Sequence, residues 1–290
     1  MTVILRHDGW EAEVVPFIGG GLAGLRYGGI DILRPSTVDS LVARDPLGLA
    51  SFPLVPYPGR IRGGQFVFDG RAVALPPNFP PNPYPLHGCG WIAEWLIAEA
   101  KANACLLRHV HAAAPSWPWS YEAELSYHLA ESSLTVRLTV GNHSATSMPV
   151  GLGQHPYFLR RPDCLLRAEV KTILWPGEDL VCDEVGPVPE NWKMAAGHRV
   201  GSVSLDHGFG GWSGRAEIGG GDRPFTVRMT APGDARFLQV YAPDGADFLC
   251  VEPMTCMPDA VNRDGAESGL IELAPGATAS LSMLISVVPD

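Results

Sequence analysis

The most restrictive feature of this sequence is a strict alternation of apolar and polar side chains over long segments. In segment 121–129 every odd position is apolar or aromatic and every even position is polar. Segments 134–140 and 279–287 largely repeat this pattern. Successive side chains of a β-strand point to opposite faces of a sheet, so a period of two indicates a strand with one buried face. The sequence therefore predicts long strands that each cover a core with one face.

Shorter runs rich in β-branched and aromatic residues mostly end at Gly, Pro, Asp or Asn, and they are 2–5, 65–68, 105–110, 225–229, 237–241 and 248–251. Helical periodicity is weak, and for its best example, segment 91–100, a helix and a bent strand both stay open. Because parallel strands need helical crossovers, the pattern predicts an all-β fold, a large antiparallel β-sandwich with few or no long helices. No repeat or linker divides the chain, so we expect a single domain over residues 1–290.

The charge balance argues against two classes of partner. The chain carries 21 Lys and Arg against 31 Asp and Glu, a formal net charge of −10 at pH 7. Nucleic acid and anionic membrane surfaces would therefore be repelled. The N-terminus lacks the pattern of a secretory signal, and no apolar run approaches the ~18 residues of a membrane helix. Six cysteines without a C-x-x-C pair are typical of reduced thiols, so we expect a cytoplasmic protein.

Polar residues gather in four stretches punctuated by Gly and Pro, as is typical of sites built on loops and strand ends. The stretches are 56–64 (PYPGRIRGG), 84–91 (YPLHGCGW), 151–158 (GLGQHPYF) and 251–262 (VEPMTCMPDAVN). Each histidine by itself is explained equally well by a turn or a packed strand end. Glu252 ends an apolar run, where a carboxylate needs a partner, but a structural hydrogen bond would satisfy it too.

Taken together and in this order, the four stretches resemble those of the aldose 1-epimerases, also called galactose mutarotases. The matching strings are Arg60-Ile61, Leu86-His87-Gly88, His155-Pro156-Tyr157-Phe158, and Glu252-Pro253-Met254 with Pro258-Asp259-Ala260 and Asn262. A weaker match is Leu205-Asp206-His207-Gly208-Phe209. The resemblance covers about residues 50–262. It implies the galactose mutarotase-like supersandwich and a free monosaccharide as substrate; we expect a monomer or a homodimer.

The resemblance also implies roles for five residues. It points to Glu252 as the general base and His155 as the general acid, and to Arg60, His87 and Asp206 as sugar-binding residues. The chemistry agrees, because opening the ring removes a proton from the C1 hydroxyl and donates one to the ring oxygen. The protein only has to exchange protons with the sugar as the ring opens and closes, so we expect neither a cofactor nor a metal.

Three positions depart from the family pattern. Gly59 stands where an Asn is expected, Cys89 where a second Gly is expected, and Met254 where a Gln often follows Glu-Pro. The acid and the base are kept, whereas contacts to sugar hydroxyls have changed. Galactose is therefore not favoured over a pentose, a deoxy sugar or another hexose.

Other functions for the same residues stay open. A sugar-binding module or sensor would not need the pairing of His155 with Glu252. A glycoside hydrolase or lyase would combine Glu252 with Asp206 or Asp259, with two carboxyls ~5–9.5 Å apart. A phosphosugar epimerase would need a second cation to clamp the phosphate, and Arg62 is the nearest one in sequence.

Two further pairs of residues offer minor alternatives. His109 and His111 have the spacing of zinc ligands on one strand face, but no third ligand lies near them in the sequence. His87 and Cys89 have the same spacing and could form a Cys–His nucleophile pair. A tight turn explains the glycines around Cys89 equally well.

Overall fold

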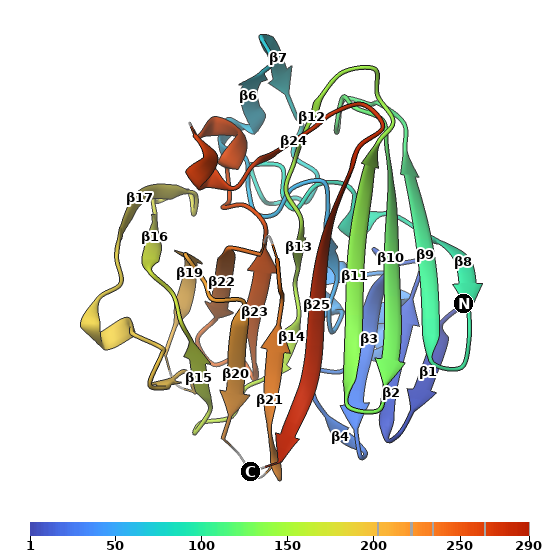
Figure 1. Ribbon diagram of the computed structural model, residues 1–290, viewed down its shortest axis with the longest axis vertical. Helices are drawn as coiled ribbons and strands as arrows, with labels where there is room; N and C mark the ends of the chain where they lie inside the picture. Colours follow the sequence, from blue (N-terminus) through green and yellow to red (C-terminus); the bar gives the residue numbers. More distant parts are fainter. Residues whose placement is uncertain (202, 221–222, 234, 264, 290) are drawn as a thin grey trace.

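The computed structural model describes residues 1–201, 203–220, 223–233, 235–263 and 265–289, and strands dominate this part of the chain (Figure 1). Its α-helix, α1 (Val38–Val42), has five residues. The other helical pieces are single 3₁₀ turns: η1 (Pro46–Gly48), η2 (Arg62–Gly64), η3 (Gly90–Ile92), η4 (Glu190–Trp192), η5 (Ala260–Asn262) and η6 (Ala266–Ser268). No helix in the described ranges is long and apolar enough to cross a membrane. The predicted all-β fold without long helices is confirmed.

One layer is a nine-stranded antiparallel sheet. In spatial order its strands are β18 (His198–Arg199), β15 (Leu165–Ala168), β20 (Arg215–Gly219), β21 (Phe225–Thr230), β25 (Thr278–Pro289), β11 (Ser133–Asn142), β10 (Tyr121–Ala130), β9 (Ala104–His111) and β8 (Leu96–Ala100). Figure 1 shows the long strands β25, β11, β10 and β9 side by side. Three of these, β10, β11 and β25, contain the alternating segments found in the sequence.

A second antiparallel sheet has eight strands. Along its main path these are β17 (Cys182–Pro187), β16 (Thr172–Pro176), β19 (Leu205–Gly210), β22 (Phe237–Ala242), β23 (Phe248–Met254), β13 (Gly153–Gln154) and β5 (Pro53–Leu54). Strand β14 (Tyr157–Leu159) pairs with β23 beyond the end of β13. The chain that connects β13 to β14 therefore follows the same side of β23.

The N-terminal strands form a four-stranded sheet of their own, with the order β1 (Val3–His7), β2 (Trp10–Val15), β3 (Gly21–Tyr27) and β4 (Ile30–Asp31). Strand β1 contacts β9 and β10. The buried hydroxyl of Tyr127 in β10 donates a hydrogen bond of 2.8 Å to the carbonyl of Gly20, which ties this sheet to the nine-stranded layer. Two small sheets complete the fold, β6 (Gln65–Phe68) with β7 (Arg71–Ala74), and β12 (Met148–Val150) with β24 (Ile271–Leu273).

The buried faces agree with the alternation in the sequence. In β10 the side chains at positions 121, 123, 125, 127 and 129 are buried, and those between them are partly or fully exposed. The main hydrophobic cluster contains residues from both ends of the chain, from Leu5 to Ile285. Segment 91–100 is neither a helix nor one bent strand, because Trp91 lies in the 3₁₀ turn η3 and strand β8 begins at Leu96.

The register of the second sheet aligns one row of residues across four strands. Glu252 of β23 lies opposite Gln239 of β22, Gln239 lies opposite Gly208 of β19, and Gly208 lies opposite Leu174 of β16. Residues directly opposite each other on neighbouring strands project from the same face. A Cβ atom at position 208 would lie 2.7 Å from Cδ1 of Leu174, so glycine is needed to keep the middle of this row open.

On its other side, β23 pairs with the chain running from β13 to β14. Gly153 lies opposite Met254, and Tyr157 lies opposite Cys250. The same register extends through the gap between these two pairs. The residue midway between Gly153 and Tyr157 is therefore placed opposite the residue midway between Cys250 and Met254.

A reciprocal pair of hydrogen bonds anchors this register just beyond the end of β23. The backbone N–H of Thr255 donates to the carbonyl of Leu152, and the N–H of Leu152 donates to Oγ1 of Thr255, both over 2.9 Å. Both residues are buried, so no water replaces these partners. The hydroxyl of Thr255 is thus part of what aligns the two chains.

Replacing Thr255 should test this anchor. Thr255→Val keeps the shape but leaves the N–H of Leu152 buried without an acceptor, so we expect the free energy of unfolding to fall by about 1–3 kcal/mol. Thr255→Ser keeps the oxygen and should cost clearly less. Urea unfolding of the three proteins measures both values, and equal losses in the two variants would contradict the role of the hydroxyl.

Candidate active site

The register of β23 brings His155 and Glu252 face to face. Nε2 of His155 lies 3.3 Å from Oε1 of Glu252, and the two side chains are only 8% and 3% exposed. Pro156 and Pro253 follow the two residues and have no N–H, so the ladder of backbone hydrogen bonds is interrupted at this point. The N–H of His155 instead donates to the carbonyl of Phe52 over 2.9 Å.

Burial favours the neutral form of both partners. Burial raises the pKa of Glu252 well above its ordinary value, and the nearby negative charge of Asp206 raises it further. Burial also lowers the pKa of His155 to about 3, with a contribution from the positive charge of Arg34. The two groups therefore hold one proton between them over a wide pH range.

His87 lies beside this pair and is fixed as a hydrogen-bond donor. Its ring centroid is 5.6 Å from that of His155, and the rings are nearly perpendicular. Its Nδ1 accepts a hydrogen bond of 3.0 Å from the N–H of Gly59. Burial lowers the pKa of His87 well below its ordinary value, so the ring is neutral and carries its proton on Nε2.

The local structure explains why position 59, one of the departures from the family pattern, is a glycine. Gly59 has a φ of +70°, in the left-handed region. A Cβ atom there would lie 2.7 Å from Cβ of Pro258. Any side chain at this position, that of Asn included, would therefore clash with Pro258.

Arg60 and Asp206 add charged groups to the site. Nε of Arg60 donates to Oδ1 of Asn82 over 3.2 Å. Oδ1 of Asp206 accepts a hydrogen bond of 2.7 Å from the side-chain amide of Gln239. Burial raises the pKa of Asp206, while the positive charge of Arg60 acts in the opposite direction. These two charged groups thus lie close enough to influence each other.

One pocket contains all five residues that the sequence singled out. Its volume of about 470 Å³ lies in the range of small-molecule sites. Its lining includes Arg60, His87, His155, Asp206 and Glu252. The structure therefore brings together residues that are spread over nearly 200 positions of the sequence.

Sequence reasoning missed several polar residues of the same pocket. Gln239 interrupts the apolar strand 237–241, and this isolated polar side chain was a signal that could have been used. Arg34 gave no such signal. Its guanidinium lies 4.2 Å from the centre of the Tyr157 ring and donates hydrogen bonds to the carbonyls of Leu47 and Leu49. Asn82 and Tyr241 also line the pocket.

The minor histidine alternatives gain no support from the geometry. His109 and His111 lie outside the lining of the pocket. The ring of His109 packs against those of Trp95 and Tyr121. Cys89 is also absent from that lining, and burial raises the pKa of its thiol, which disfavours a thiolate nucleophile.

Asp259 and Arg62, which two of the alternative functions would require in the site, bind other residues instead. Oδ1 of Asp259 accepts hydrogen bonds from the N–H of Arg62 and the side-chain amide of Asn262, and Asp259 does not line the pocket. The guanidinium of Arg62 pairs with Asp179 and Asp183. Neither a carboxyl pair with Asp259 nor a phosphate clamp with Arg62 is thus formed in this pocket.

Within the described ranges, His155, Cys250 and Glu252 form a group whose ligand-type atoms lie within 4.8 Å of one another. Burial raises the pKa of the Cys250 thiol as well as that of Glu252. A cation would have to displace protons from both groups. The arrangement therefore suits proton transfer better than metal binding.

The raised pKa of Glu252 implies a stability cost at neutral and alkaline pH. Its folded pKa lies above the ordinary value of 4.5, so stability falls as the pH rises from 4.5 towards the folded pKa. Glu252→Gln stays neutral and should therefore be more stable than the wild type at pH 8.

Thermal unfolding of both proteins between pH 5 and pH 9 measures this difference. Above about pH 7.5 His155 is neutral in both the folded and the unfolded chain, so its titration adds no pH dependence there. We expect the advantage of Glu252→Gln to grow with pH. A difference that does not change with pH would contradict the raised pKa.

Comparison with known proteins places this chain in a family. A family model described as aldose 1-epimerase matches residues 1–286. An Escherichia coli protein named "Uncharacterized protein YphB" is 31% identical over 308 residues, covering 99% of both chains. A second protein of that organism, "Uncharacterized protein YihR", is 25% identical and covers 90% of this chain and 86% of its own length.

Two solved structures show a similar fold over almost the whole chain. The crystal structure of a candidate aldose 1-epimerase from Escherichia coli K12 has a TM-score of 0.93 and 28% identity, covering 100% of this chain and 99% of its own. A galactose mutarotase-like protein from Clostridium acetobutylicum shares the fold, with a TM-score of 0.90 and 20% identity over 99% of this chain and 95% of its own. With a family model that spans nearly the whole sequence, the chain belongs to the aldose 1-epimerase family.

Proposed function

We propose that the protein interconverts the α and β anomers of a free aldose by general acid–base catalysis. The observation that carries this proposal is the buried pair of His155 and Glu252, with 3.3 Å between Nε2 and Oε1, in a pocket of about 470 Å³. Such a pair supplies one acid and one base at a single position. Membership of the aldose 1-epimerase family supports the same reaction.

The reaction is a pair of proton transfers. The carboxylate of Glu252 takes the proton of the C1 hydroxyl while the imidazolium of His155 donates a proton to the ring oxygen. The bond between C1 and the ring oxygen breaks, and C1 becomes an aldehyde. Rotation about the C1–C2 bond turns the other face of the aldehyde towards the ring oxygen. Reclosure with both transfers reversed then gives the other anomer and restores the two groups.

The pKa shifts strengthen both groups for these roles. A carboxylate with a raised pKa is a stronger base, and an imidazolium with a lowered pKa is a stronger acid. The neutral pair that burial favours becomes the reactive ion pair when one proton moves from Oε1 to Nε2. This move crosses only the 3.3 Å between the two atoms. Burial thus makes the reactive state less populated but more potent.

The neighbouring donors are suited to the charge that develops during ring opening. Arg60 and the Nε2–H of neutral His87 would stabilise negative charge on the oxygen bound to C1. Asp206 and Gln239, joined by their own hydrogen bond, would bind other hydroxyl groups of the sugar. No residue beyond these is required to open and close the ring.

Substitution of the pair should remove catalysis. Because each transfer contributes about 10²–10⁴-fold, Glu252→Gln and His155→Asn should each lower kcat by that factor. Polarimetry or NMR on freshly dissolved α-anomers of a small panel of aldoses measures the rate. Glu272→Gln and His143→Asn are matched controls, because both side chains are exposed and lie outside the pocket.

Two outcomes would count against the proposal in different ways. Undiminished catalysis by both pair variants would refute the assignment of the acid and the base. If the wild type binds aldoses but accelerates the mutarotation of none, the sugar-binding module or sensor becomes the better explanation.

The pH dependence should be broad and bell-shaped. Activity requires one proton on the pair, so it is lost at low pH when both groups are protonated and at high pH when neither is. Since the pKa of His155 is lowered to about 3 and that of Glu252 is raised, kcat/KM should stay level through pH 6.5, the ordinary pKa of histidine. A titration of kcat/KM from pH 4 to pH 10 measures this profile, and a steep loss of activity centred near pH 6.5 would contradict it.

A further inference from the structure

The pocket has a far end that the proposed mechanism does not use. The row of opposed residues runs from Glu252 through Gln239 and Gly208 to Leu174. Neighbouring strands lie about 4.8 Å apart, so the backbone at Leu174 is roughly 14 Å from that at Glu252. One sugar ring therefore has room to lie over Gln239 and Gly208, between the acid–base pair and Leu174, all of which line the pocket.

The wall at this far end is apolar. It is formed by strand β16 and by the hairpin that joins β16 to β17, which contribute Leu174, Pro176, Leu180 and Cys182 to the lining. None of these four side chains carries a strong hydrogen-bonding group. The acid and the base lie at the opposite end of the row, on β23 and on the chain between β13 and β14, whereas Asp206 lies on β19, the neighbour of β16.

The hairpin backbone offers few free donors. The N–H of Gly177 donates to the carbonyl of Val181, and the N–H of Leu180 donates to the carbonyl of Gly177. The N–H of Val181 donates to Oδ1 of Asp179. A sugar hydroxyl placed against this wall would therefore lose hydrogen bonds to water and find few partners in the protein to replace them.

Leu180 is the most unusual residue of the hairpin. Its φ is +60°, in the left-handed region that residues other than glycine rarely adopt. Although it is apolar and lines the pocket, it is 48% exposed. A strained, half-exposed leucine at the edge of a binding pocket is well placed to contact a ligand.

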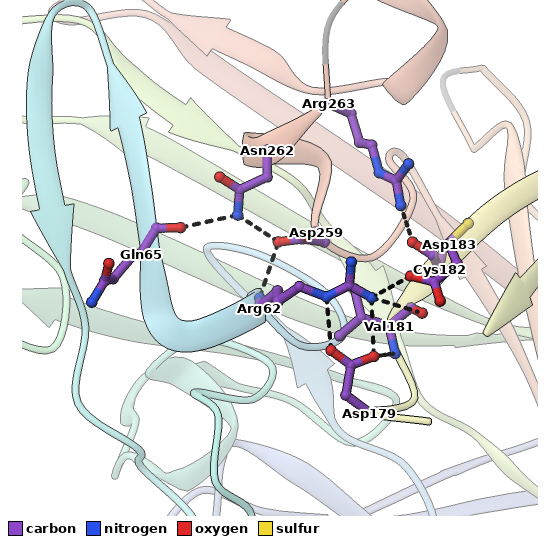
Figure 2. Close-up of polar contacts among 9 residues, drawn as sticks. All are labelled: Arg62, Gln65, Asp179, Val181, Cys182, Asp183, Asp259, Asn262 and Arg263. Carbon is purple, nitrogen blue, oxygen red and sulfur yellow. Dashed lines mark hydrogen bonds and ion pairs between the residues drawn. The ribbon is translucent and has the colours of Figure 1, made fainter. Parts of the chain in front are cut away.

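The conformation of the hairpin is held by Arg62 (Figure 2). Nε and Nη2 of Arg62 donate to the two carboxylate oxygens of Asp179, over 2.7 and 3.0 Å, and Nη2 also donates to Asp183 over 2.6 Å. Arg263 adds a hydrogen bond to the carbonyl of Cys182. The hairpin tip is thus fastened on both sides of Leu180.

The other side of the clamp is anchored in the fold. The backbone N–H of Arg62 donates to Oδ1 of Asp259, which also accepts from Nδ2 of Asn262. Asn262 donates in turn to the carbonyl of Gln65 (Figure 2). Arg62 therefore connects the hairpin to the same turn that carries the sugar-binding Arg60.

We propose that Leu180 is a specificity-determining residue and Arg62 a positioning residue that together select aldoses lacking a hydroxyl at C3 or C4. This rests on the proposed function. In a pyranose the C3–C4 edge lies opposite the bond between C1 and the ring oxygen. With that bond at His155 and Glu252, the C3–C4 edge faces the apolar wall. A 3-deoxy or 4-deoxy aldose avoids burying a hydroxyl there.

Monodeoxy sugars test the proposal directly. The experiment measures kcat/KM for mutarotation of D-glucose, D-galactose, their 2-deoxy and 3-deoxy derivatives, and the single 4-deoxy sugar common to both, each corrected for its spontaneous rate. The 3-deoxy or the 4-deoxy derivative should exceed its parent by at least about fivefold, within the limit of ~10² for rejecting an added hydroxyl by an apolar wall. The 2-deoxy derivative, changed next to the reaction centre, should show no such gain.

The variant Leu180→Asn tests whether the apolar wall causes the preference for deoxy sugars. Asn tolerates the left-handed conformation, so the hairpin should keep its shape while the wall gains a polar group. The preference for the deoxy sugar should then fall to within twofold of its parent. Equal preferences in the wild type and in Leu180→Asn would overturn the role of Leu180.

Arg62→Gln tests the clamp. Because the hairpin is released but the acid and the base are untouched, KM for the preferred deoxy sugar should rise at least fivefold, more than kcat falls. Arg62→Lys, which cannot bind Asp179 in the same bidentate way, should restore the low KM only in part. Arg108→Gln on β9, which loses comparable ion pairs far from the pocket, is the control and should keep wild-type kinetics.

The two proposals fail differently. Mutarotation without any gain for the 3-deoxy or 4-deoxy sugars overturns the specificity proposal and leaves the mutarotase function standing. An equal fall of kcat in Arg62→Gln for all sugars, with KM unchanged, overturns the positioning role. If the wild type accelerates no aldose at all, the proposed function and the specificity built on it both fail.

Discussion

The structure of this site depends on the strand register that places His155 opposite Glu252. The two residues are almost a hundred positions apart, yet pairing of the chain around β13 and β14 with β23 leaves Nε2 and Oε1 only 3.3 Å apart. In a sheet a slip of one residue moves a side chain to the opposite face. The register must therefore be held firmly for the pair to exist, and the buried hydrogen bonds between Leu152 and Thr255 contribute to holding it.

Burial has two opposing effects on this pair. It shifts the pKa of Glu252 upward and that of His155 downward, which strengthens the base and the acid that the proposed reaction needs. The same burial lowers the stability of the folded state at pH values where Glu252 would be charged in water. The burial that makes these groups reactive therefore also lowers the stability of the folded protein.

The pocket joins two chemically different ends. Donors, acceptors and charges surround the pair, whereas leucines and a proline form the wall beyond Gly208. The wall is held in place by Arg62, whose partner Asp179 is 117 positions away in the sequence. One turn of the chain thus supplies both Arg60, which lines the polar end, and Arg62, which fastens the apolar end.

The sequence by itself determined the strand-dominated fold and pointed to residues that the folded chain gathers in one pocket, but not how they interact. Alternation at positions 121–129 reports directly which side chains face the core. The four motifs and the weaker match around Asp206 together pointed to five residues that all line one pocket. Arg34 and the hairpin around Leu180 were missed, and the fate of segment 91–100 was left open. Their positions depend on pairings between distant strands, on burial and on long-range ion pairs. Local patterns encode which face of a strand is buried, whereas only the folded chain decides which strands become neighbours and which charges lose their water.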